Sequence, residues 1–308
     1  MKVEIIKPQG YCYGVIRAIE IVKATRQEYP HTNIYILGMI VHNKFIVQAL
    51  EDLNVKTLDD SKVSRYDLLD LIDEGIVILS AHGSEEKVIK KAQDKGLIVI
   101  DAVCHDVTKT QTIIKDYLLN NYEVLYIGKE NHPEALAVLS IDEHIHLIRN
   151  ENDLYQIKDL LKDAPMMITN QTTISIIDAK NIYEKAQTLF TNIIIIPEIC
   201  NATRIRQEAV LKLNDEMTLV YVVGDPQSNN SNKLAELAGS KQRRVIMIEN
   251  VADIKLDDLK DVEYVGITSG ASTPTYLTNQ IITYLKQFNY QDLKTYPKPV
   301  VDITKILD

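Results

Sequence analysis

The chain has 308 residues, of which 45% are hydrophobic, enough for two or three domains with buried cores. Its formal net charge of -9 disfavours nucleic acid and anionic membrane as partners but leaves room for a small anionic ligand. Because no apolar window approaches the length of about 18 residues that a membrane span needs, and no signal-peptide pattern opens the chain, we expect a cytoplasmic protein.

Strand and helix patterns alternate from the start of the chain. An apolar run leads to Cys12, and residues 15–28 place their apolar side chains on one helical face. A strand is predicted at Ile34–Leu37, a helix at 44–53 and a further strand at Ile76–Leu79. The strands are apolar with little alternation, as expected when both faces of a parallel sheet are covered.

The same alternation continues to the end of the chain. Further strands are predicted at 124–127, 166–168, 219–223, 245–248 and 265–267, and further helices at 108–119, 206–213 and 231–237. Alternating strands and helices indicate an α/β fold with parallel sheets and right-handed crossovers. Pro297 and Pro299 interrupt this order, and residues 300–307 are expected to form a short strand or an arm.

The only three cysteines are spaced almost evenly, 92 and 96 residues apart, at Cys12, Cys104 and Cys200. Each follows a predicted strand and precedes a predicted helix. An odd number argues against a disulfide framework, whereas thiols near helix N-termini are readily available as thiolates. Three thiolates suit zinc or an iron–sulfur cluster with one position open, and the absence of a Cys-x-x-Cys motif favours the cluster.

The segments after the cysteines repeat. A strand ending in glycine follows 26, 24 and 24 residues after the cysteines, at Gly38, Gly128 and Gly224, and polar residues begin about four positions later. Another polar turn lies 70, 68 and 72 residues after the cysteines, at His82, Thr172 and Ser272. This period is too long for a solenoid and predicts three copies of a small α/β domain.

We therefore predict three domains at residues 13–104, 105–197 and 198–285. The N-terminal strand, residues 1–12, is expected to join the third domain, and residues 286–308 to form a C-terminal arm. Ligands of open parallel sheets bind beyond the carboxyl ends of the strands, so the turns are expected to converge on one site around a pseudo-threefold axis.

Those turns carry chemically useful side chains. Residues 228–232 combine hydroxyl and amide groups in front of a predicted helix, a pattern typical of both a helix cap and an anion cradle. Glu134 is the obvious carboxylic proton donor among the turns. His42, His82 and His132 lie at or beside predicted strand ends, which favours a functional role for the three together.

Ten short motifs occur in order between Pro8 and about Leu285. They are 10–15, 41–43, 80–83, 107–109, 132–134, 171–173, 199–203, 206–209, 228–232 and 270–272. With these motifs the chain resembles the 4-hydroxy-3-methylbut-2-enyl diphosphate reductase family. The resemblance implies a trefoil of three similar α/β domains with pseudo-threefold symmetry around a central iron–sulfur cluster.

The resemblance also implies roles for individual residues. Cys12, Cys104 and Cys200 would bind a [4Fe–4S] cluster with one iron not bound by protein. The implied substrate-binding residues are His42, His82, His132, Thr172, Ser228, Asn229, Asn230 and Ser272. Glu134 would deliver the proton, with Thr172 and His132 as the other catalytic residues.

The implied reaction is a two-electron reductive dehydroxylation that gives isopentenyl and dimethylallyl diphosphate, the last step of the non-mevalonate isoprenoid route. The implied partners are the allylic diphosphate substrate and an electron donor such as ferredoxin or flavodoxin. Where the family commonly has threonine and proline around the second cysteine, this chain has Val103 and His105, and Asn229 replaces a common serine. Two alternative hypotheses are a zinc hydrolase or deaminase with a three-cysteine site, and a non-enzymatic iron–sulfur redox sensor.

Overall fold

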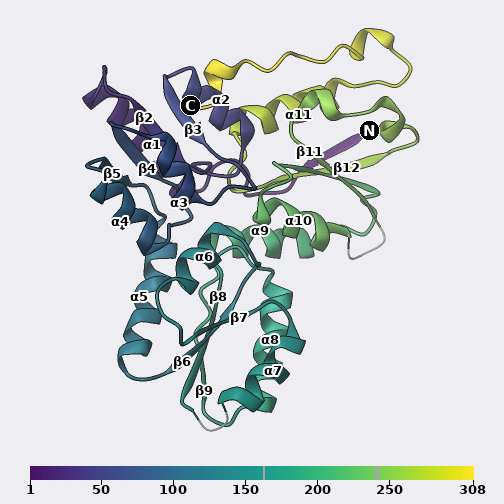
Figure 1. Cartoon of the computed structure of the whole chain (residues 1–308). Helices are drawn as coiled ribbons and strands as arrows, with labels where there is room; N and C mark the ends of the chain where they lie inside the picture. Colours follow the sequence, from purple (N-terminus) through teal and green to yellow (C-terminus); the bar gives the residue numbers. More distant parts are fainter. Residues whose placement is uncertain (162–163, 240–242) are drawn as a thin grey trace. The chain divides into compact units, whose positions relative to one another are not determined.

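The computed structural model describes residues 1–161, 164–239 and 243–308. Its strands form three parallel sheets of four strands each (Figure 1). The prediction of an α/β fold with parallel sheets is confirmed, since each strand pairing within the described residues is parallel.

The first sheet has the strand order β3-β2-β4-β5. Its strands are β2 (Ile34–Leu37), β3 (Val55–Leu58), β4 (Ile76–Leu79) and β5 (Ile98–Asp101). The helices of this part of the chain are α1 (Tyr13–Glu28), α2 (Lys44–Glu51), α3 (Arg65–Leu68), the short 3-10 helix η1 (Leu69–Leu71) and α4 (Glu86–Asp94). Leu37, Val77 and Leu79 pack on one face against α3, η1 and α4.

The second sheet has the order β7-β6-β8-β9. Its strands are β6 (Glu123–Ile127), β7 (Ile145–Ile148), β8 (Met166–Asn170) and β9 (Ile193–Ile195), and its helices are α5 (His105–Leu119), α6 (Pro133–Leu139), α7 (Glu151–Leu161) and α8 (Ile176–Leu189). Helices α5 and α6 cover one face, where Tyr126 is buried, and α7 and α8 cover the other (Figure 1).

The third sheet has the order β1-β12-β10-β11. Its strands are β1 (Lys2–Ile5), β10 (Leu219–Val223), β11 (Arg244–Ile248) and β12 (Tyr264–Ser269). The accompanying helices are α9 (Asn201–Leu211), α10 (Asn229–Gly239), α11 (Thr275–Gln287) and the 3-10 helices η2 (Val251–Asp253) and η3 (Leu256–Leu259). The N-terminal strand pairs with β12, with Lys2 opposite Tyr264.

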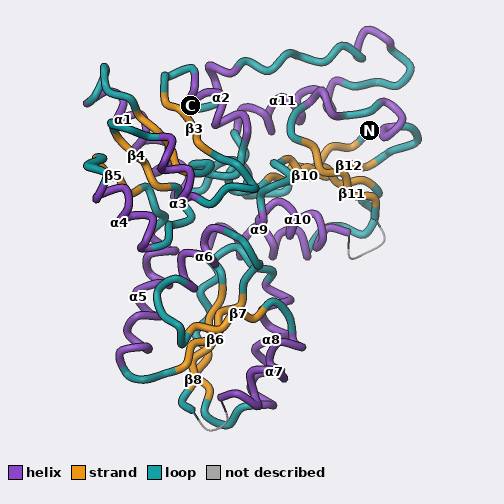
Figure 2. The backbone as a smooth tube through the Cα atoms, in the orientation of Figure 1, coloured by secondary structure: helices purple, strands orange, loops and turns teal. Residues whose placement is uncertain are grey.

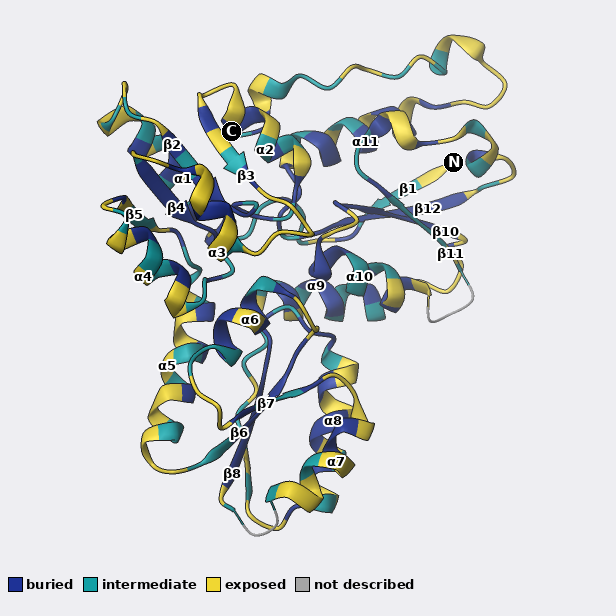
Figure 3. Cartoon of the chain, in the orientation of Figure 1, coloured by how far each residue is buried: buried dark blue, intermediate teal, exposed yellow. Residues whose placement is uncertain are grey.

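All three sheets share one strand order. After each cysteine the chain forms three strands of one sheet, and the first of them (β2, β6 or β10) lies between the other two. The strands at the centres of the sheets are almost wholly buried (Figure 3). Such burial on both faces explains why their sequences are mostly apolar rather than alternating.

The chain separates into two compact units. The first comprises residues 1–16, 41–53 and 201–308, and the second comprises residues 17–40 and 54–200. The third sheet belongs to the first unit, and the other two sheets belong to the second. Within the described ranges, no helix is long and apolar enough to cross a membrane.

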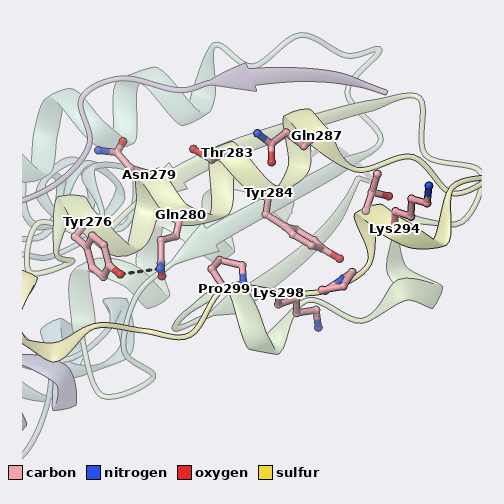
Figure 4. A pocket seen from close by; sticks show the side chains of 11 residues that line it. Tyr276, Asn279, Gln280, Thr283, Tyr284, Gln287, Lys294, Lys298 and Pro299 are labelled. Carbon is pink, nitrogen blue, oxygen red and sulfur yellow. Dashed lines mark hydrogen bonds between the residues drawn. The ribbon is translucent and has the colours of Figure 1, made fainter.

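After α11 the chain runs mostly as loop, with the 3-10 helices η4 (Leu293–Thr295) and η5 (Ile303–Lys305) (Figure 2). No strand forms there among the described residues, so of the two predicted alternatives the strand is wrong. Phe288 stacks on Tyr296 with ring centroids 5.5 Å apart, which fixes the start of this segment. Between the segment and α11 lies an open cavity of about 700 Å³ that Lys294 and Lys298 help to line (Figure 4).

Candidate functional site

Each cysteine lies directly before a helix, because α1, α5 and α9 begin at the following residue. The strand before each cysteine, β1, β5 or β9, pairs with a neighbouring strand, β12, β4 or β8. The backbone N–H of each cysteine donates a hydrogen bond to a carbonyl in the turn after that neighbouring strand. The pairs are Cys12 with Ala271 (2.9 Å), Cys104 with Ala81 (3.0 Å) and Cys200 with Thr172 (3.0 Å). The three thiols are therefore presented by three equivalently built turns.

Each of the three thiols is a ligand of the kind that an iron–sulfur cluster takes. All three are partly buried, and none is joined in a disulfide within the described chain. The carbonyls of Cys12 and Cys104 accept the first i to i−4 hydrogen bonds of α1 and α5, from the N–H groups of Ile16 and Thr108 at 3.0 Å each. A helix N-terminus presents unsatisfied N–H groups and positive partial charge, which favours an anionic sulfur ligand. Thiolates are the ligands that such clusters prefer.

Glu134 lies in the second unit, in the first turn of α6, and its side chain is buried with 1% exposure. Three hydrogen bonds hold its carboxyl group. The Thr172 backbone N–H donates to Oε1 at 2.8 Å, the Thr172 hydroxyl donates to Oε2 at 2.9 Å, and the Tyr126 hydroxyl donates to Oε1 at 3.3 Å. The carboxyl group is thus fixed in one orientation.

Burial raises the pKa of Glu134 to about 7 because the charged form loses its hydration, and nearby Asp106 adds to the rise. The hydrogen bonds from Thr172 and Tyr126 lower the pKa and offset part of this effect. A carboxyl group with a pKa near neutral pH can both donate and accept a proton at that pH. This is the property expected of a general acid.

His132 caps the N-terminus of α6. Its Nδ1 accepts the Glu134 backbone N–H at 3.1 Å, so in the neutral ring the proton lies on Nε2. The ring meets that of His82 edge to face, with centroids 5.3 Å apart. Arg65 supports the turn around His82 by donating to the Gly83 carbonyl at 2.8 Å. The second unit therefore brings together His82, His132, Glu134 and Thr172.

In the first unit, the turn that carries His42 is held by residues from the third repeat. The Ser272 hydroxyl donates to the His42 carbonyl at 3.1 Å, and the Lys44 backbone N–H donates to Asp225 Oδ2 at 3.0 Å. Asn43 caps α2 by accepting the N–H groups of its first turn. These contacts bring the predicted site residues His42 and Ser272 together.

The predicted anion cradle lies at the N-terminus of α10. Ser228, Asn229 and Asn230 are all buried, and Ser228 Oγ accepts the Ser231 N–H at 3.3 Å. Both polar atoms of the Asn230 amide are buried and have no hydrogen-bond partner among the described residues. Since buried polar groups are normally satisfied, an unsatisfied amide at a helix N-terminus indicates the place of a polar ligand.

Two contributors to this geometry were missed in the sequence. The sequence pattern places Tyr126 in a strand, and the structure shows that its buried hydroxyl contacts Glu134. Arg65 lies outside every motif and supports the His82 turn. A tyrosine within an otherwise aliphatic buried strand is a usable signal, because its hydroxyl needs a partner.

Comparison with known proteins decides between the hypotheses drawn from the sequence. The family model described as "LytB protein" matches residues 3–286. The chain belongs to this family. A relative from Exiguobacterium sp. is 42% identical over all of this chain and 98% of its own length, and one from Bacillus thuringiensis is 44% identical over all of this chain and 97% of its own.

Both relatives are named 4-hydroxy-3-methylbut-2-enyl diphosphate reductase. Among solved structures, the E-1-hydroxy-2-methyl-but-2-enyl-4-diphosphate reductase from Plasmodium falciparum is similar with a TM-score of 0.86 and 31% identity, over 94% of this chain and 89% of that one. A second solved reductase, the terminal enzyme of the non-mevalonate pathway, gives a TM-score of 0.64 and 27% identity, over 94% of this chain and all of that one. The predicted family and the prediction of an oxidoreductase are confirmed, and the family implies an iron–sulfur cofactor.

Proposed function

We propose that the chain reduces 4-hydroxy-3-methylbut-2-enyl diphosphate to isopentenyl and dimethylallyl diphosphate, as the last step of the non-mevalonate isoprenoid route. The reaction removes the allylic hydroxyl group as water and puts hydrogen in its place, so each turnover consumes two electrons and two protons. Relatives named 4-hydroxy-3-methylbut-2-enyl diphosphate reductase match this chain over nearly their whole lengths, which supports the proposal.

Cys12, Cys104 and Cys200 would hold a [4Fe–4S] cluster with one iron not bound by protein. The backbone N–H of each cysteine makes an equivalent hydrogen bond, and this likeness supports a shared role for the three residues. When bound, the cluster would supply the electrons and a Lewis acid for the substrate hydroxyl group. The electrons would come from a one-electron carrier protein such as ferredoxin or flavodoxin.

The buried carboxyl group of Glu134 is the observation that carries the mechanism. A hydroxide ion is a poor leaving group, so the reaction needs an acid that is protonated near neutral pH and shielded from water. Glu134 combines a pKa of about 7 with almost complete burial. It would protonate the departing oxygen, directly or through the Thr172 hydroxyl that already donates to it. His132 anchors the same turn by capping α6.

The diphosphate would be bound by His42, His82, His132, Ser228, Asn229, Asn230 and Ser272. The chain as a whole is acidic, so local donors rather than net charge must attract this group. The N-terminus of α10 offers backbone dipoles and the unsatisfied Asn230 amide, and the imidazole rings add N–H donors. Thr172 would contact the substrate hydroxyl at the other end.

The direct test is anaerobic turnover of 4-hydroxy-3-methylbut-2-enyl diphosphate with reduced methyl viologen as electron donor. We expect substrate-dependent oxidation of two viologen radicals for each five-carbon diphosphate product. Boiled protein and substrate lacking the hydroxyl group serve as controls. A colourless protein that contains stoichiometric zinc and oxidises no viologen would contradict the proposal.

A further inference from the structure

Three cations lie five or six residues after the three cysteines, in the helices that the cysteines precede. Each reaches the segment in front of a different cysteine. The contacts are Arg17 Nη1 to the Val103 carbonyl (2.7 Å), Lys109 Nζ to the Glu198 carboxylate (2.9 Å) and Arg206 Nη2 to the Gly10 carbonyl (2.7 Å). Each contact lies within one compact unit. We call these three contacts the cysteine clasps.

The clasps follow one cyclic order. The helix after Cys12 contacts the residue before Cys104, and the helix after Cys104 contacts a residue two positions before Cys200. The helix after Cys200 closes the order by contacting the residue two positions before Cys12. Their sequence separations of 86, 89 and 196 residues exclude local helix capping as the reason for the contacts.

Arg206 forms the most deeply buried clasp, with 3% exposure. Its Nη1 donates to the Ala202 carbonyl at 2.9 Å within α9, which directs Nη2 toward Gly10. Gly10 has a φ of +76° and its N–H donates to Ser269 Oγ at 3.0 Å, so the turn before Cys12 is fixed on both sides. A buried guanidinium is costly unless its donors are used, which implies that this contact has a specific purpose.

The other two clasps also act on turns that are already anchored. The Val103 N–H donates to Asp101 Oδ1 at 2.8 Å, and the Glu198 N–H donates to Asn170 Oδ1 at 3.0 Å. The Lys109 side chain is 53% exposed whereas Glu198 is 10% exposed. Solvent screening therefore makes this the weakest of the three.

We propose that Arg17, Lys109 and Arg206 are positioning residues that hold the three cysteine turns in the geometry of one shared ligand set. The inference rests on the proposed function, in which the three thiols bind one cofactor. A site with three protein ligands has one fewer covalent restraint than a four-cysteine site. Contacts behind the ligands must therefore supply more of the preorganisation.

The test is hydrogen–deuterium exchange on the full-length protein, in the metal-free and the cluster-loaded forms, for R17Q, K109Q and R206Q. Each turn contains hydrogen-bonded amides that report on it, within residues 102–104, 196–200 and 10–12. R26Q is the matched control, because Arg26 lies in α1 and also donates to backbone carbonyls, those of Tyr29, Pro30 and Thr32.

We expect each variant to speed exchange in its own segment. The increase should be about tenfold in 102–104 for R17Q and in 10–12 for R206Q, because hydrogen bonds to charged groups are strong. The increase in exchange rate should be about threefold in 196–200 for K109Q, because the Lys109–Glu198 pair is exposed to solvent. R26Q should leave all three segments unchanged. In loaded protein, R206Q should also alter the electron paramagnetic resonance spectrum of the reduced cluster.

Unchanged exchange in an assigned segment, equal acceleration of all three segments, or an unchanged spectrum in R206Q would overturn the inference. The exchange pattern is measured in the metal-free protein as well. Failure of the unsubstituted protein to load a cluster would therefore contradict the proposed function, while the exchange data would still decide the clasps.

Discussion

Glu134→Gln is the substitution that tests the mechanism most sharply, because it removes the exchangeable carboxyl proton and keeps the shape of the side chain. The amide oxygen can still accept from the Thr172 N–H and the Tyr126 hydroxyl, which now contact Oε1. The Thr172 hydroxyl can rotate to accept from the new NH₂ group. Folding and cluster binding should therefore survive the change.

The expected loss of turnover is about 10²- to 10⁴-fold, the usual contribution of a positioned general acid. The structure also predicts an effect on stability. The pKa of Glu134 is raised from 4.5 to about 7, so between these pH values the folded protein holds a proton that the unfolded chain has released. Stability from this group is therefore full below about pH 4.5 and is lost as pH rises to about 7, a total on the order of 3 kcal/mol.

The amide of the Glu134→Gln variant does not titrate, so its stability should not fall in this way. The variant should therefore become more stable relative to the unsubstituted protein as pH rises from 5 to 8. Urea unfolding of both metal-free proteins at the two pH values measures this difference, and the viologen assay measures turnover. Glu143→Gln, a change to an exposed loop carboxylate, is the control. Near-normal turnover, or an unchanged stability difference between the two pH values, would refute the assigned role of Glu134.

Three further substitutions test the surroundings of the site. Tyr126→Phe removes a hydrogen bond that lowers the pKa of Glu134, so the decline of turnover at alkaline pH should shift upward by about half a pH unit; an unshifted pH profile would argue against the contact. Asn230→Ala should raise KM about tenfold with cluster content unchanged, because its amide is expected to contact the diphosphate, and an unaltered KM would remove it from the binding set. Gly10→Ala should destabilise the fold by about 1 kcal/mol or more in urea unfolding, since φ is +76° and a Cβ atom would lie 2.2 Å from Thr275 Oγ1; equal stability would show that the turn adapts.

The sequence predicts the central strands of the sheets well, but no strand is predicted at β3 or β7, which lie at sheet edges. The runs at Ile34–Leu37, Ile76–Leu79 and Leu219–Val223 coincide with β2, β4 and β10, because strands buried on both faces form continuous apolar runs. The predicted helix at 44–53 begins where α2 begins, at Lys44, but the other predicted helices start later than the observed ones. α5 was expected from residue 108 and begins at His105, because its first turn is polar and shows no apolar periodicity.

The site could be predicted only as a set of residues. The repeat singled out the cysteines and Glu134, but the pKa of Glu134 depends on burial beneath α6 and on hydrogen bonds from two other strands or turns. The cysteine clasps join residues at least 86 positions apart, so no local pattern reveals them. Such contacts follow from tertiary structure alone.

The central claim is that the three cysteines form one ligand set, and its most direct test is the iron content of anaerobically reconstituted protein. We expect about four irons per chain in the unsubstituted protein, with broad visible absorption. Most of the iron and most of the visible absorption should be lost in each of the variants Cys12→Ser, Cys104→Ser and Cys200→Ser. Retention of four irons in any one of these variants would show that this thiol is not a ligand and would contradict the shared site.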